Sequence, residues 1–126
     1  MALSANAKIE AAESFVRTVN EAHDFLQLQD ATSAQRRYEN LLEQISQARE
    51  HLRFNPEGGR PARFLDVATK QGHAVAARAL ALAAAHGVPS LREHIFKPYV
   101  LLYAHGPKRV VLLALKHDRQ LQFNID

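Results

Sequence analysis

Apolar residues in the first half of the chain recur every three or four positions, which is the spacing of a helix with one buried side. The first run contains Ile9, Ala12, Phe15/Val16, Val19, Ala22 and Phe25/Leu26, and the second contains Tyr38, Leu41/Leu42, Ile45, Ala48 and Leu52. Capping residues at 30–33 separate the runs. A short strand over Phe15–Val19 would explain fewer of these positions. The pattern therefore predicts an antiparallel helical hairpin over about residues 7–54.

The hairpin is followed by Asn55–Pro61, whose prolines and glycines cannot continue a helix. We interpret Gly58–Pro61 as a turn, because no Lys-Ser/Thr pair follows and Pro61 has no amide donor for a phosphate. An alanine-rich helix is predicted over about residues 73–86, with Gly87 and Pro89 as its stop. Since it has little bulk to bury, we expect it to cover the edge or the face of another element, by preference an edge of the sheet.

The last third of the chain changes to a strand-like pattern over about residues 91–125. Its runs, rich in Val, Leu and aromatic residues, are Leu91–Lys97, Tyr99–His105 and Lys108–His117. Short connections predict antiparallel neighbours. Because Val110–Leu115 is apolar on both faces, this strand is expected in the middle of the sheet. We predict a single α+β domain over residues 1–126: an N-terminal helical hairpin packed on a C-terminal antiparallel β-sheet, with an extra alanine-rich helix inserted before the sheet.

Charge is distributed unevenly along the 126 residues, although the net charge is only +3. Residues 91–126 contain six Lys/Arg against three Asp/Glu, so this third is the expected face for a phosphate backbone or an acidic protein segment. The absence of cysteine excludes disulfides, thiolate metal sites and a cysteine nucleophile. With neither a leader-like start nor a membrane-length apolar run, we expect a soluble cytoplasmic protein. No metal or cofactor motif is present, so none is expected.

The densest polar cluster is Lys116–Phe123, at the end of the most buried strand. Strict alternation along that strand would place Arg109, Val111, Leu113, Leu115 and His117 on one face and Lys116 on the other. On the first strand, Arg92 and His94 share a face. If the two faces meet, imidazole and guanidinium groups would suit metal-free RNA cleavage. The same groups also suit an acidic partner or an ordinary solvated surface.

Five short segments together resemble the RelE/ParE toxin superfamily of type II toxin–antitoxin (plasmid stabilisation) systems. They are Asn55-Pro56, Gly59-Arg60-Pro61, Leu91-Arg92-Glu93-His94, Tyr99-Val100-Leu101-Leu102-Tyr103, and the run from Val110 to Arg119. The resemblance covers about residues 36–65 and 91–123. It implies a helical hairpin on an antiparallel sheet, a cognate antitoxin as partner, and a possible homodimer or toxin–antitoxin hetero-oligomer.

Function differs within the family. RelE-like members cut messenger RNA on the ribosome, and position would then give His117, Arg119 and Arg92 catalytic roles. ParE-like members instead arrest growth through DNA gyrase. For antitoxin or target binding, the resemblance implies Arg92, His94, Lys116, Arg119 and Phe123.

Four departures from the family pattern favour the ParE-like side. Residues 66–90 look like an insertion, and the usual amino-terminal strand is not evident in the sequence. Phe123 has no hydroxyl, so it cannot replace an acid–base tyrosine. The Lys/Arg set of strong ribosome-dependent nucleases is also thin. We therefore expect a ParE-like growth-arresting toxin, with a RelE-like messenger RNA endoribonuclease and a non-toxic binding module of the same fold as the alternatives.

Overall fold

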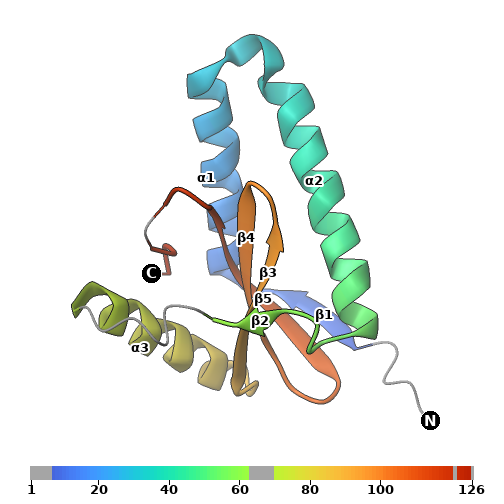
Figure 1. Ribbon diagram of the computed structural model, residues 1–126, viewed down its shortest axis with the longest axis vertical. Coiled ribbons are helices and arrows are strands. Elements are labelled where there is room, and N and C mark those ends of the chain that lie inside the picture. Colours follow the sequence, from blue (N-terminus) through green and yellow to red (C-terminus); the bar gives the residue numbers. More distant parts are fainter. Residues whose placement is uncertain (1–6, 63–69, 121, 126) are drawn as a thin grey trace.

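The computed structural model of the protein describes residues 7–62, 70–120 and 122–125, and for residues 70–72 the backbone alone. The described residues form three helices and a five-stranded sheet (Figure 1). The helices are α1 (Glu13–Gln29), α2 (Ala31–Phe54) and α3 (Lys70–Ala85). The strands are β1 (Lys8–Ala11), β2 (Arg60–Pro61), β3 (Ser90–Phe96), β4 (Tyr99–His105) and β5 (Arg109–His117).

The sheet has the order β1-β5-β4-β3-β2. The three strands predicted for the last third are antiparallel neighbours within a residue or two of their expected bounds, so this part of the prediction is confirmed. β5 has a neighbour on each side, and all of Val110–Leu115 is buried, as expected of a central strand. The sheet as a whole is mixed, because β1 runs parallel to β5. After His117 the chain makes a turn, and no described residue from there to Ile125 belongs to a strand.

The beginning of the predicted hairpin is wrong. The helical pattern was extended back to Ile9, but Lys8–Ala11 forms β1 and α1 begins only at Glu13. The parallel pairing with β5 decides this, since β1 lies beside residues about a hundred positions later, from Arg109 to Leu112. A strand of four residues is too short to show a clear two-residue alternation, and its apolar residues also fit the helical spacing of the segment that follows.

The helical hairpin itself is confirmed, and its turn is short. Asp30 caps α2 by accepting a hydrogen bond from the Thr32 amide at 3.1 Å. Figure 1 shows α1 and α2 lying side by side as an antiparallel pair whose tip extends past the end of β3 and β4. This hairpin covers one face of the sheet, where its buried residues pack with Tyr99, Leu101 and Tyr103.

The alanine-rich helix α3 covers the other face of the sheet and not, as we expected, an edge. Its buried residues Val75, Ala79 and Ala83 pack in one cluster with strand residues that include Leu102 and Leu113. The small side chains of α3 let the helix lie close to the sheet, whose leucine and valine side chains fill most of the space between them. The predicted stop is confirmed, because Gly87, two residues after the end of α3, has a left-handed φ of 73°. The first part of the proposed 66–90 insertion lies outside the described residues.

A β-bulge in β5 reverses the predicted faces at the end of the strand. Leu102 of β4 pairs with Ala114 whereas Tyr103 pairs with Leu112, so Leu113 has no partner in β4. Beyond the bulge, Leu115 joins the cluster under the helical hairpin, on the same side as Leu112. Strict alternation was therefore wrong for Leu115 and His117, which lie on the face opposite Leu113.

Helix α1 supplies the hydrogen bonds that the bulged strand lacks. The Ser14 hydroxyl donates to the Leu113 carbonyl, and the Thr18 hydroxyl accepts from the Leu115 amide at 2.9 Å. Both contacts are buried, where an unpaired backbone group would be costly. None of the helices that the structure describes combines the length and apolar character needed to span a bilayer.

Candidate functional site

The end of β5 places His117 at the rim of the sheet, under the helical hairpin. Its ring meets the Tyr99 ring edge-on, with centroids 5.8 Å apart. Its backbone amide donates to the Gln120 side-chain oxygen at 2.9 Å, and the next amide, that of Asp118, donates to the Pro98 carbonyl at 2.7 Å. These bonds fix the turn that follows the strand. As the sequence predicted, the imidazole is partly accessible and sits at a strand end.

The Nδ1 atom of His117 has two partners that require different protonation states. The Arg119 amide donates to Nδ1 at 3.1 Å, which is possible only when Nδ1 carries no proton. The Asp118 carboxylate lies 3.0 Å from the same atom and can form an ion pair only when Nδ1 is protonated. A proton on Nδ1 would break the hydrogen bond from the Arg119 amide and allow the ion pair with Asp118.

A pocket of about 340 Å³ opens beside His117, between α1 and the end of the sheet. Its apolar wall comprises Ala22, Phe25, Tyr99 and Leu115, and its polar lining comprises Thr18, Glu21, Gln29, Lys116, His117, Arg119 and Gln120. Half of the Phe25 side chain (53%) is exposed, and Leu28, one helical turn further, is 87% exposed. Apolar side chains thus continue from the pocket toward the end of α1.

The contribution of α1 to this pocket was missed at the sequence level. Phe25 and Leu26 were both assigned to the buried stripe, yet adjacent residues are about 100° apart on a helix and cannot both face the core. Leu26 is the buried one. Two adjacent large apolar residues in one helix, Phe25 and Leu26, therefore indicate that one of them remains at the surface.

Tyr99 forms the floor between His117 and the helical hairpin. Burial raises the pKa of its phenol, and the charge of the Arg37 guanidinium on α2 lowers it by a smaller amount. Arg37 and Arg119 therefore bring positive charge toward this part of the pocket from two different elements. Neither guanidinium forms an ion pair among the residues that the structure describes.

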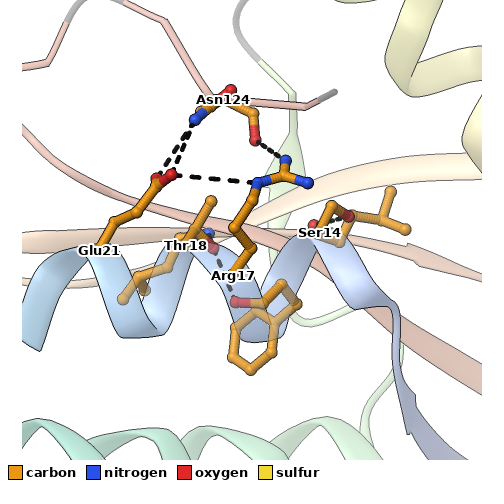
Figure 2. A network of polar contacts seen from close by, with 8 residues as sticks. Ser14, Arg17, Thr18, Glu21 and Asn124 are labelled. Atoms are coloured by element: carbon orange, nitrogen blue, oxygen red, sulfur yellow. Dashed lines mark hydrogen bonds and ion pairs between the residues drawn. The ribbon is translucent and has the colours of Figure 1, made fainter.

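The acidic residue of the pocket, Glu21, is already engaged by the C-terminal segment (Figure 2). The Asn124 side-chain amide donates to both Glu21 carboxylate oxygens, at 3.2 and 3.1 Å. Arg17 donates to the Asn124 backbone carbonyl at 3.0 Å, and its Nε lies 4.0 Å from the same carboxylate. Glu21 thus connects the C-terminal segment to α1.

Lys116 lines the pocket, but its ammonium lies with Phe123 on the opposite side of β5. The Lys116 ammonium donates to the Gln120 carbonyl at 3.0 Å and lies 5.4 Å from the centroid of the Phe123 ring. Phe123 itself is buried in the cluster under α3. The structure therefore makes Phe123 a core residue that anchors the C-terminal segment, although we had predicted a binding role for it.

Arg92 does not meet His117. On β3 it lies opposite Tyr103 of β4, whereas His117 lies opposite Tyr99. Four residues along a strand correspond to about 13 Å. The Arg92 guanidinium instead donates to the Gly59 carbonyl at 2.8 Å and to Nε2 of His105 at 3.1 Å. The imidazole and guanidinium groups that we proposed as one catalytic set are thus divided between the two ends of the sheet.

His94 shares the face of Arg92, as alternation predicted, but contacts the helical hairpin. Its ring centroid is 5.4 Å from that of His51 on α2 and 6.1 Å from that of Phe96. Burial, and to a smaller extent the His51 charge, lowers the pKa of His94. This favours a neutral packing residue over a cationic binding residue.

Within the described part of the chain, no three or more His, Cys, Asp or Glu residues are grouped so that they could hold a metal ion. No protein-family model matches the sequence, and no curated protein matches it significantly. Its function is therefore inferred from the residues and their arrangement.

Proposed function

We propose that the protein is a growth-arresting toxin of the RelE/ParE type that acts, as ParE-like members do, by binding a protein target such as DNA gyrase, and that a cognate antitoxin neutralises it. The proposal begins with the five segments that resemble this family. Two features of the fold support it. A helical hairpin packs on the sheet that contains the last three strands, and a strand, β1, precedes the hairpin where none was evident in the sequence. The second feature supports the family type only, because the missing strand had counted toward the ParE-like side.

The observation that favours protein binding over RNA cleavage is the separation of Arg92 from His117. A metal-free ribonuclease needs its proton-transfer group and its phosphate-stabilising cation at one phosphate. Arg92 is instead occupied by Gly59 and His105 at the other end of the sheet. What remains at His117 is a pocket with an apolar wall and Arg119 at its mouth, which suits a protein surface better than a scissile phosphate.

The alternative function is a RelE-like messenger RNA endoribonuclease. One observation favours it: His117 and Arg119 lie together on the pocket, and His117 has partners for both of its protonation states. In that case His117 would transfer the proton and Arg119 alone would stabilise the phosphate charge. A second alternative is a non-toxic binding module, in which the same pocket would serve a partner without growth arrest.

One expression experiment separates these functions. The protein is induced without its antitoxin in a bacterial host, and growth, message integrity and plasmid supercoiling are followed together. Growth arrest with intact messages and altered supercoiling is the expected result. Codon-phased message cuts that disappear in His117→Ala would replace the proposal with the nuclease. Normal growth at a verified level of soluble, folded protein would leave only the non-toxic binding module.

A further inference from the structure

The pocket beside His117 combines three properties that together define a ligand class. It has an apolar wall, it continues into the exposed side chains Phe25 and Leu28, and it is lined by the Arg119 guanidinium, which has no ion-pair partner among the described residues. Arg119 lines the pocket directly, and Arg37 acts on Tyr99 from α2.

We propose that this pocket is an anchor site for an acidic peptide segment that inserts one large aliphatic or aromatic side chain. The inserted side chain would contact Ala22, Phe25 and Leu115, and carboxylates flanking it in the partner's sequence would pair with Arg119 and Arg37. This inference deepens the proposed function, on which it rests, by stating the chemistry through which the protein partner is recognised.

The volume and the lining favour one inserted side chain. A volume of about 340 Å³ has room for one Leu or Phe side chain, and the side-chain amides of Gln29 and Gln120 in the lining can bond the partner's backbone. The Glu21 carboxylate accepts two hydrogen bonds from Asn124 and lies 4.0 Å from the Arg17 Nε, so the Arg17 charge offsets part of its repulsion of the flanking carboxylates. An apolar anchor surrounded by a charged rim is the usual arrangement of a protein-binding hot spot.

A nucleic acid fits the same site less well. The arginines, His117 and Tyr99 could receive a phosphate and a base, but Leu28 would then expose an aliphatic surface with no role. Stacking sites use aromatic faces, whereas most of the apolar surface leading to this pocket lies on the outer side of one amphipathic helix. A helical or extended protein segment can cover that surface along its whole length.

The test uses the full chain and three fluorescein-labelled probes. Two are decapeptides with two glutamates on each side of the centre, one with a central Leu-Leu pair and one with Gly-Gly, and the third is a decauridine RNA. We expect the Leu peptide to bind at least about tenfold more tightly than the Gly peptide, since burial of one Leu side chain changes affinity by that factor or more. Equal binding of the two peptides, or tighter binding of the RNA, would overturn the inference.

Substitutions then locate the binding. Arg37→Gln combined with Arg119→Gln should weaken the Leu peptide by about tenfold and remove most of its salt dependence. Arg36→Gln, on the exposed side of α2, removes the charge of a neighbouring arginine and serves as the matched control. Ala22→Trp should fill the pocket and abolish the preference for Leu. Should that variant fail to fold, Phe25→Ala removes exposed apolar surface without opening the core.

Failure of this inference can be told apart from failure of the proposed function. Leu-selective binding without growth arrest on expression would retain the anchor site and reject the toxin. Growth arrest with no selective peptide binding, or binding unaffected by the Ala22 and Phe25 substitutions, would retain the toxin and reject the anchor site.

Discussion

The Arg92 guanidinium donates to Nε2 of His105 at 3.1 Å, across the pair of neighbouring strands β3 and β4. This contact requires an unprotonated Nε2, and it draws Arg92 toward the turn before β2, where Gly59 accepts a second bond. His105 is 7% exposed, so the bond is shielded from water on the imidazole side. These two contacts make Arg92 a residue that positions the turn before β2, and they leave its guanidinium little freedom to reach a phosphate bound at His117.

Arg92→Ala should therefore lower stability. The substitution leaves the Gly59 carbonyl and the His105 imidazole without their donor, and we expect the free energy of unfolding to fall by about 1–3 kcal/mol. Urea denaturation followed by circular dichroism measures this. Arg36→Ala, at an exposed position of α2, is the control and should stay within about 0.5 kcal/mol of the wild type. A stable Arg92→Ala protein that has lost growth arrest would instead assign Arg92 a functional role.

We expect the β-bulge to depend on the hydroxyl of Thr18, which accepts a hydrogen bond from the Leu115 amide. Thr18→Val keeps the shape of the side chain but removes the acceptor of the Leu115 amide, which is buried between α1 and β5. An unpaired buried amide should cost about 1–3 kcal/mol of unfolding free energy. Thr18→Ser keeps the acceptor and should recover most of that loss. If Val and Ser variants melt alike, the hydroxyl does not hold the bulge.

Gly87 is expected to resist substitution because of its backbone and not because of space. A Cβ added there would come no nearer than 3.7 Å to Arg109, which is an ordinary contact, but its φ of 73° is left-handed. Gly87→Ala should cost about 1–2 kcal/mol. Gly106→Ala meets Val88 at a similar 3.5 Å without a left-handed φ and is the matched control. Thermal denaturation of both variants tests the difference, and equal melting temperatures would contradict it.

Stability should decrease in mild acid because of His94. Its pKa is lowered in the folded protein by burial and by His51, so the unfolded chain takes up this proton first. The stabilisation from neutral His94 is then complete above about pH 6.5, the ordinary histidine pKa, and is lost as the pH falls toward the folded value. His94→Gln should flatten the pH dependence of the unfolding midpoint below pH 6.5. His73→Gln, at an exposed position of α3, should leave it unchanged.

The local patterns of the sequence determined the helical hairpin, the stop at Gly87 and the three antiparallel strands, because each depends on neighbours within a few turns or a short connection. The burial of Val110–Leu115 followed from its continuous apolar run. The candidate site was predicted in part: His117 and Arg119 do lie together at a strand end.

Tertiary structure alone decided the rest. β1 exists because its residues pair with a strand about a hundred positions away, and β2 exists because two residues of the turn reach β3. The bulge at Leu113 turned His117 toward α1, and strand register set Arg92 about 13 Å away along the sheet. No periodicity within one segment encodes register between segments, since pairing is set by contacts distant in the sequence. Which side chains share a site was therefore fixed only when the sheet was assembled.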